Sequence, residues 1–433
     1  MAATVQTNHA DTPREALAAF KKGHFDQVIR QLETLAPDQD PPRELLKIGV
    51  ESYLKLGRPE TAFKSYLKLI PSGQPDDARL LREIATAFVT SHVRDPEEYV
   101  RIAAYTALKD GAEPQMTPVL EDGLFDSSAM VRALATEGLG HALVAAKSSK
   151  PSSGLTALKR ALQDPAPAVR IAAISALGDT GDQSVVDILR RIARADEGAL
   201  PVFAAAALVK LGHAEAFDDI LSTATLPDPN ARMAAIGVLG RLKLPRGFTV
   251  LSQSVYDPDP SVRAFAAGAL GEFGTPESAA SLTHAIGDED PRVRSIAAAS
   301  LGRLQLPHTR PLLWQAARDP VDFVRAGALE GLLRIGDTEA SLVARELSKH
   351  ADPSIRSAVA QAIGLSRYKQ GAPLLDLLRQ DLQPQPRLMA ARALGRMARR
   401  EAVPVLKPML QDSDTAVRVT AAGSLLQVLR QTK

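Results

Sequence analysis

The sequence predicts an all-α solenoid of about eleven helical hairpins, each 31 residues long, and three observations support this fold class. A phrase recurs along the chain: DPDPSVRAFAAGALGEFG at 257–274 returns 31 residues later as DEDPRVRSIAAASLGRLQ. Aromatic residues make up only 4% of the chain and alanine is plentiful, which favours closely packed helices over sheets. With 433 residues, the chain is too long for one ordinary core, so a repeat array or several domains are needed.

An arginine within the phrase sets the register of the repeats. The step between successive arginines is 31 residues, except for one step of 38 after Arg132 and one of 62 after Arg170. Pro201 stands halfway across the longer gap, in a segment that keeps the alanine pattern. Eleven units are therefore expected between about residue 93 and residue 433, which is the signature of a solenoid. Ten of them carry the arginine: Arg101, Arg132, Arg170, Arg232, Arg263, Arg294, Arg325, Arg356, Arg387 and Arg418.

Each unit contains two helical patterns. In the second pattern, apolar residues at −1, +3, +7 and +10 from the arginine share one helix face. Asp-Pro pairs such as Asp257-Pro258 precede this helix and suit its start, and a glycine at +8 is expected near its end. One such pair of helices cannot bury its apolar face alone, so neighbouring units must stack.

These phrases resemble HEAT repeats, in particular the short variety found in phycobilisome-lyase-like proteins. The resemblance covers 93–433 and implies a right-handed superhelix whose concave surface is lined by the second helix of each unit. It also implies a hydrogen-bonded ladder between neighbouring repeats, made by the turn aspartates and the helix arginines. The ladder is expected to comprise the ten arginines above with Asp164, Asp257, Asp288, Asp319 and Asp412.

The sequence itself supports a structural role for these charges. Every unit with the arginine has an aspartate six or four residues before it, whereas the unit with Pro201 has neither residue in register. Arginine and aspartate disappear together, as expected if each would otherwise leave the other unpaired. For Arg294, the expected carboxylate partner is Asp288 or Asp290.

The N-terminal part lacks the 31-residue phrase. Helical hairpins are expected at 15–35 and 44–70, and their spacing resembles tetratricopeptide repeats. This predicts three regions: a disordered N-terminus at 1–12, a tetratricopeptide-like region at 13–92, and the HEAT-like array at 93–433 with a flexible insertion at 147–154. The N-terminal helices either cap an open apolar end of the array or bind a peptide.

No catalytic, cofactor-binding or metal-binding residues are predicted. The eight histidines are scattered and none precedes a glutamate, and no phosphate-binding loop or nucleophile motif is present. The chain contains no cysteine, which excludes thiolate chemistry and disulfides. A net charge of +2 argues against a global field for nucleic acid, and no apolar run has the length of a membrane span. We therefore expect a cytoplasmic protein that is not an enzyme.

A groove along the second helices is the expected binding surface. Positions +1, +5 and +9 lie opposite the buried helix face, with apolar residues at +1 in several units and small residues at +5 in the middle units. Five candidate partner-binding residues form a basic column at +9: Lys210, Arg241, Arg303, Arg334 and Arg396. The apolar +1 residues are Ile171, Val202, Met233, Leu388 and Val419.

The predicted function is a non-catalytic scaffold or adaptor that holds a protein or an extended peptide along the concave face. The basic column suits an acidic partner. One alternative, implied by the resemblance alone, is a subunit of a bilin lyase or isomerase-like complex. The other is nucleic-acid binding, for which the charge at the C-terminal end is weak and lacks neighbouring aromatic residues.

Overall fold

The computed structural model describes residues 12–34, 41–71, 73–111, 113–146, 153–194 and 198–430, and all regular elements within these ranges are α- or 3₁₀-helices. Most of the expected N-terminal extension at 1–12 and of the insertion at 147–154 lies outside the described residues. Two boundaries differ from expectation: Thr12 already belongs to the first helix, and Ser153 and Gly154 begin a helix of the array.

Four helices precede the array and form two antiparallel hairpins, as expected from the sequence. They are α1 (Thr12–Lys21), α2 (Phe25–Glu33), α3 (Arg43–Lys55) and α4 (Pro59–Leu69). α1 packs on α2 and α3, and α3 packs on α4, which in turn contacts α5. Most buried apolar side chains of α3 and α4, including Tyr53 and Tyr66, belong to the same core as the array. Leu45 and Ile48 of α3 instead pack with α1 and α2 in a separate small core.

Eleven pairs of helices follow, and we number them repeats 1 to 11, each with an A helix followed by a B helix. The A helices are α5 (Ala78–Ser91), α7 (Thr117–Gly123), α9 (Ser153–Ala161), α11 (Val186–Ala193), α13 (Phe217–Thr223), α15 (Phe248–Gln253), α17 (Ser278–Ala285), α19 (Arg310–Ala316), α21 (Ala340–Leu347), α23 (Ala372–Leu378) and α25 (Val403–Met409). The B helices are α6 (Glu98–Gly111), α8 (Ala129–Ala146), α10 (Pro167–Thr180), α12 (Leu200–Lys210), α14 (Pro229–Leu242), α16 (Pro260–Phe273), α18 (Pro291–Arg303), α20 (Asp322–Arg334), α22 (Pro353–Ser366), α24 (Pro384–Met397) and α26 (Thr415–Arg430).

Short 3₁₀-helices accompany many of the A helices. They are η1 (Pro114–Met116), η2 (Gln183–Val185), η3 (Ala214–Ala216), η4 (Pro245–Gly247), η5 (Ser254–Tyr256), η6 (Pro307–Thr309), η7 (Lys369–Gly371) and η8 (Arg400–Ala402). Seven of them lead directly into an A helix, and η5 follows α15. The array therefore begins at α5, earlier than the expected boundary at residue 93, because α5 is the A helix of repeat 1.

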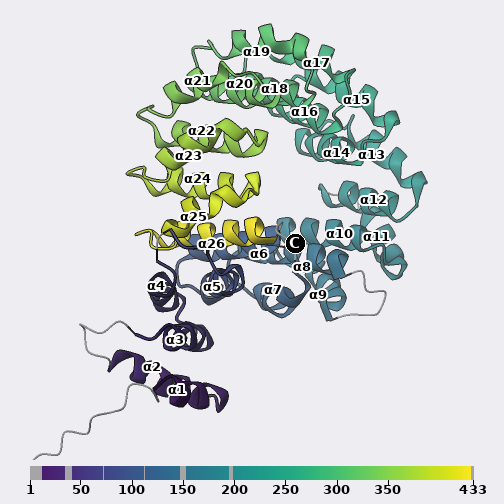
Figure 1. Ribbon diagram of the computed structural model, residues 1–433. Helices are drawn as coiled ribbons and strands as arrows, with labels where there is room; N and C mark the ends of the chain where they lie inside the picture. Colours follow the sequence, from purple (N-terminus) through teal and green to yellow (C-terminus); the bar gives the residue numbers. More distant parts are fainter. Residues whose placement is uncertain are drawn as a thin grey trace, which may run out of the picture.

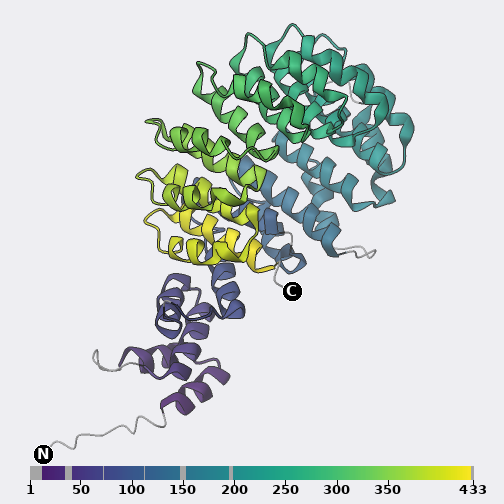
Figure 2. The same ribbon diagram turned by 45° about the horizontal axis from the view of Figure 1, so that its top comes forward.

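The solenoid closes on itself into a ring. Each B helix packs on the next one, and the last, α26, packs on α6 and α5 of repeat 1. Figure 1 shows α26 beside α6, and Figure 2 shows the same meeting of the two ends from another side. In Figure 1 the B helices α14, α16, α18 and α20 lie closer to the centre than A helices α13, α15, α17 and α19. The concave surface expected from the sequence is thus the inner face of a ring, and both apolar ends of the array are buried against each other.

Glycine at +8 allows the B helices to approach one another closely. A Cβ atom at these positions would lie 2.2–2.8 Å from the +6 residue of the next repeat, which is alanine, serine or glycine. The positions are Gly140, Gly178, Gly240, Gly271, Gly302, Gly364 and Gly395. As expected, most of these glycines lie within two residues of the helix end, but they do not cap it: α16 continues past Gly271 to Phe273 and is capped by Gly274, whose φ is 75°.

Candidate functional site

Seven of the ten repeated arginines form bidentate ion pairs with the next repeat. In each pair, Nε and an Nη atom donate to the two carboxylate oxygens of an aspartate over 2.6–3.1 Å. Another Nη atom donates to two carbonyl oxygens of the turn before the arginine's own helix. The pairs are Arg101–Asp126, Arg132–Asp164, Arg232–Asp257, Arg263–Asp288, Arg294–Asp319, Arg356–Asp381 and Arg387–Asp412.

The two aspartate positions before the arginine have different roles. The aspartate at −6 accepts the ladder bonds from the preceding repeat, whereas the aspartate at −4 caps the B helix, as Asp259 does by accepting from the backbone N–H of Ser261. The expected partner of Arg294 was therefore wrong. Its carboxylate partner is Asp319 of the following repeat, while Asp288 offers only its carbonyl oxygen and Asp290 caps α18.

The ladder is interrupted where its aspartate is missing from the next repeat. Pro201 replaces the arginine in repeat 4, and Leu226 stands at −6 in repeat 5, so both partners of that junction are absent. Arg325 faces a repeat with His350 at −6 and instead contacts Asp322 and Glu346. Arg170 donates to two carbonyl oxygens of its own turn. The positions −6 to −4 of the following repeat, residues 195–197, lie outside the described residues.

The lowered pKa values and the burial of the paired aspartates indicate that these ion pairs stabilise the fold. Hydrogen bonds from Arg132 hold the pKa of Asp164 below its usual value, and Arg356 has the same effect on the pKa of Asp381. The paired side chains are largely buried, so each charge depends on its partner for solvation. The ladder residues therefore bind one another between repeats, and a surface for a partner must be formed by residues at other positions.

The inner face of the ring is formed by positions −2, +2, +5 and +9 of the B helices, which fall within one sector of the helix. The apolar +1 residues do not line this face uniformly, in contrast to the expectation. Val202 and Val419 are buried, whereas Ile171, Met233 and Leu388 are half-buried. Large apolar side chains reach solvent instead at −2 and +2, including Phe265 and Phe323.

The five residues of the expected basic column have different surroundings. Lys210 forms an ion pair with Asp179, the +9 residue of the preceding repeat, over 2.6 Å. Arg241 lies over the ring of Phe203, 5.6 Å from its centroid. Arg303 and Arg334 share the carboxylate of Glu330. Arg396 makes no ion pair with a described residue.

Arg396 lines a cleft of about 530 Å³ that crosses the closure of the ring. The +9 residues of repeats 9, 10, 11 and 1 all line it, so side chains from both sides of the closure share one cleft. We call it the rim cleft, and its lining consists of Asp110, Gly364, Leu365, Arg367, Gly395, Arg396, Ala398, Gln427 and Arg430. The repeat period predicts part of this cluster, but Asp110 could be placed only by knowing that the ring closes.

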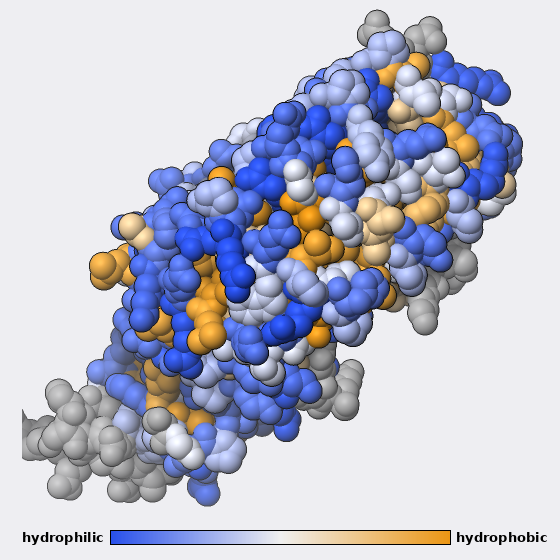
Figure 3. Space-filling model, turned by 90° about the horizontal axis from the view of Figure 1, so that it is seen from above, coloured by the Kyte–Doolittle hydropathy of each residue, from blue (hydrophilic) through white to orange (hydrophobic). Residues whose placement is uncertain are grey.

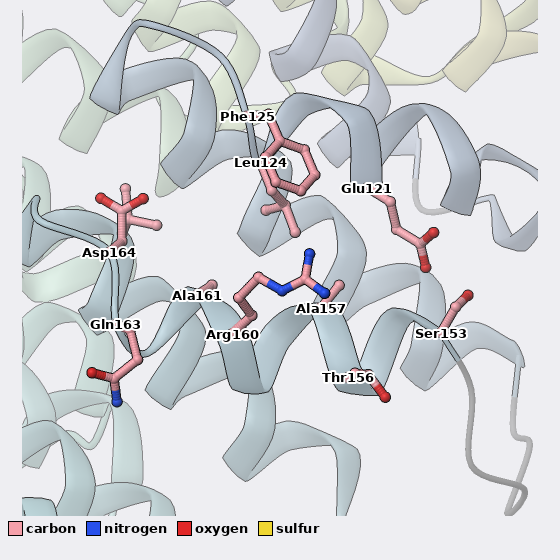
Figure 4. Close-up of a pocket in the computed structure, with 11 residues that line it drawn as sticks. Glu121, Leu124, Phe125, Ser153, Thr156, Ala157, Arg160, Ala161, Gln163 and Asp164 are labelled. Atoms are coloured by element: carbon pink, nitrogen blue, oxygen red, sulfur yellow. The ribbon is translucent and has the colours of Figure 1, made fainter.

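A second pocket, of about 480 Å³, lies between α7 and α9. Arg160 points from α9 toward Leu124 and Phe125, and its guanidinium carbon lies 5.9 Å from the centroid of the Phe125 ring (Figure 4). Asp164, at the edge of the pocket, is already paired with Arg132. In the sequence, this region is marked only by the longer step of 38 residues between Arg132 and Arg170, which predicted an insertion but not a pocket.

A third cleft, of about 530 Å³, lies where α1, α3 and α5 face the start of repeat 2. Five of its six charged side chains are paired within the chain: Arg79 bonds to Glu51 and Glu83, and Arg82 bonds to Glu113. The sixth, Lys55, makes no ion pair with a described residue. A peptide-binding role for the N-terminal helices stays a prediction.

Apolar and hydrophilic side chains alternate over the outer surface (Figure 3). The face seen from above carries separate apolar patches between hydrophilic regions (Figure 3).

Among the described residues, no group of three or more histidine, aspartate or glutamate side chains is arranged to hold a metal ion. The same part of the chain has no helix that is both long and apolar enough to cross a membrane.

Comparisons with known proteins agree with the repeat fold. A family model described as HEAT repeats matches 118–202, 248–333 and 371–431, together more than half of the chain. A search of curated proteins finds no relative of this sequence.

Several solved structures resemble the chain weakly. YibA of E. coli has 19% identity and a TM-score of 0.37, over 60% of this chain and 95% of that one. The CpcE–CpcF complex of phycocyanin lyase from Nostoc has 18% identity and a TM-score of 0.36, over 64% and 97%. Human deoxyhypusine hydroxylase has 16% identity and a TM-score of 0.29, over 59% and 97%. With such scores, no property of those proteins is carried over to this chain.

Proposed function

Because the chain belongs to the HEAT-repeat family, we propose that it is a non-catalytic, cytoplasmic scaffold or adaptor that binds a protein or an extended peptide at the inner face of its ring. The observation that carries the proposal is apolar side chains at this face that the fold leaves in solvent. Tyr99, Met130, Phe265 and Phe323 are 51%, 56%, 52% and 49% exposed, although each lies on a B helix. Apolar and aromatic groups of this kind act as anchors in protein interfaces.

The charge of the inner face supports an acidic partner. The candidate residues Lys210, Arg241, Arg303, Arg334 and Arg396 occupy the same position in their repeats, so they follow one edge of the ring. Three of them have a carboxylate partner within the chain. The pair of Lys210 with Asp179 lies partly in solvent and is weak, so an acidic partner can exchange with Asp179 at little cost. Glu330 is buried, so Arg303 and Arg334 keep it as a partner and offer only their remaining N–H groups to a ligand.

Closure of the ring restricts how a partner reaches this face. A partner cannot slide in from the side, because α26 packs on α6. It enters from one rim, or the ring opens. An extended segment or a loop meets this condition more readily than a globular surface does.

The experiment is charge reversal at the inner edge, with a matched reversal outside. The triple variant Arg241→Glu, Arg303→Glu and Arg334→Glu should fold by circular dichroism and should associate more slowly with a partner isolated by pull-down, as measured by surface plasmon resonance. The control reverses the exposed outer residues Arg246, Arg318 and Lys349. Unchanged association of the inner variant, or equal slowing in both, would show that the partner binds elsewhere.

Neither alternative from the sequence gains a specific supporting observation among the described residues. For the bilin lyase alternative, the test is whether the purified protein acquires the absorbance of a tetrapyrrole. For nucleic acid, it is a steep loss of affinity with added salt.

A further inference from the structure

The rim cleft and the helical turn of α24 beside it carry arginines that the fold does not use. Arg367, Arg392 and Arg396 make no hydrogen bond or ion pair with a described residue through their guanidinium groups, unlike the ladder arginines. Arg430 also lines the cleft, but its guanidinium is held by Glu113. Arg367 and Arg396 line the cleft without a carboxylate partner, and Arg392 lies one helical turn before Arg396 on α24, beside the cleft.

Arg392 is the most unusual of the three. It stands at +5 of repeat 10, on the inner face, where repeats 4 to 7 have only glycine or alanine, such as Gly237 and Gly268. Burial lowers its pKa, and the nearby charge of Arg396 lowers it further, while Asp110 opposes this effect. A partly buried cation beside a like charge is unfavourable by itself, and an anion between the two would relieve it.

The rest of the lining favours a peptide over a nucleic acid. Gly364, Leu365, Gly395 and Ala398 form small or apolar walls that allow a polypeptide backbone to approach. Asp110 and Gln427 supply acceptors for peptide N–H groups. The lining contains no aromatic ring on which a base could stack.

We infer that the rim cleft binds carboxylate groups of an acidic peptide segment, with Arg367 and Arg396 as the lining residues that receive them and Arg392 as a further positive charge beside Arg396. The planar guanidinium groups suit bidentate pairing with carboxylates. This inference rests on the proposed function, because the peptide would belong to the protein partner.

The test uses the full chain and a fluorescent hexaglutamate peptide with both ends blocked, so that all its charges are side-chain carboxylates. Fluorescence anisotropy at low salt should show binding that weakens with ionic strength. Arg392→Gln and Arg396→Gln should each weaken binding by about tenfold or more. The control Arg345→Gln, an exposed arginine of α21 outside the cleft, should change it by less than about twofold.

A second readout separates a binding role from a structural one. Without peptide, Arg392→Gln should raise the melting temperature, because it removes a partly buried charge next to Arg396. Hexaglutamate should raise the melting temperature of the unmodified protein but not that of this variant. A variant that melts lower and still binds the peptide normally would assign Arg392 to the fold and overturn the inference.

Competition distinguishes the two sources of anions. Displacement of hexaglutamate by pyrophosphate or by a single-stranded oligonucleotide at a lower concentration than unlabelled peptide would identify a phosphate site and overturn the assignment to a peptide. The triple reversal of Arg241, Arg303 and Arg334 should leave hexaglutamate binding intact. If the triple variant loses partner binding and hexaglutamate does not bind the unmodified protein, the scaffold function is supported and the peptide site in the rim cleft is refuted.

Discussion

The junctions of repeats 6, 7 and 8 differ from the closure between repeats 11 and 1. At the regular junctions, Arg263 and Arg294 reach the aspartates at −6 of the following repeats, and the glycine at +8 lies against the residue at +6. At the closure, Arg418 bonds only to Thr415 and two carbonyl oxygens of its own turn, and its Nε is buried without a partner. Gly423, at +5 instead of +8, lies against Ala107. The last helix therefore meets the first about one helical turn out of register.

Different side chains hold the closure. Arg430 and Arg82 both bond to Glu113, over 2.8 and 2.6 Å. Lys407 of α25 reaches Asp76, which precedes α5, over 2.8 Å. These residues have no counterpart in the other repeats, since they join the array to segments outside the 31-residue phrase. The comparison teaches that the repeated residues determine how neighbours stack, whereas single, unrepeated charges fasten the two ends.

The largest effect is expected where two B helices come closest. A Cβ added at Gly302 would lie 2.2 Å from the Cα of Gly331, so Gly302→Ala should destabilise the protein by about 3 kcal/mol through overpacking. The matched control is Gly237→Ala on the inner face, where the nearest atom outside the local backbone is 3.8 Å away. That change should stabilise by about 0.5–1 kcal/mol, because alanine has the higher helix propensity. Urea unfolding measures both, and equal effects would refute the packing role of the +8 glycines.

The next effect compares a ladder arginine with its counterpart at the closure. Arg294→Ala should cost about 1–3 kcal/mol, because it leaves the carboxylate of Asp319 largely buried and unpaired. Arg418→Ala should cost less than about 1 kcal/mol, since no carboxylate depends on Arg418. Thermal and urea unfolding of the two variants provide the comparison. A larger loss for Arg418→Ala would mean that the closure relies on this arginine after all.

A smaller, pH-dependent effect follows from the same pair. Burial alone would raise the pKa of Asp319, but hydrogen bonds from Arg294 and the N–H of Val321 outweigh it and hold the pKa below its usual value. A carboxylate with a lowered pKa in the folded state contributes stability that is present above its unfolded pKa, about 3.9, and is lost as the pH falls through the folded value. The difference in stability between the unmodified protein and Arg294→Ala should therefore narrow by about 1 kcal/mol between pH 6 and pH 3. A difference that is constant over this range would show that the arginine acts through its carbonyl bonds and packing.

Much of the ring could be predicted from the sequence, because its contacts repeat with the 31-residue period. The eleven units, the ladder arginines and the insertion after repeat 2 all follow from spacing. The assignment of Asp290 could not be made, because an aspartate four residues before the arginine satisfies the same pattern by capping a helix. Closure could not be predicted either, since Arg430 and Glu113 are 317 residues apart and belong to no period. Only part of the rim cleft could therefore be predicted. The repeat period identifies Arg396, but the presence of Asp110 in the same cleft depends on closure of the ring.

The smallest effect is expected at the closure itself. Burial alone would raise the pKa of Glu113, yet Arg430 and Arg82 outweigh it and hold the pKa below the usual value, so this carboxylate is charged at neutral pH and joins two helices. Glu113→Gln keeps one acceptor oxygen but removes the charge, and should weaken the closure by about 1 kcal/mol or less. Hydrogen exchange should then show faster opening of α26 and α6, while α16 and α18, which are joined by Arg263 and Asp288, keep their protection. Added salt should reduce the difference in exchange rate between the unmodified protein and Glu113→Gln, because salt screens the ion pairs of Glu113 that the variant lacks. Equal exchange in α26 with and without the charge would show that the packing of Gly423 on Ala107 closes the ring without help from Glu113.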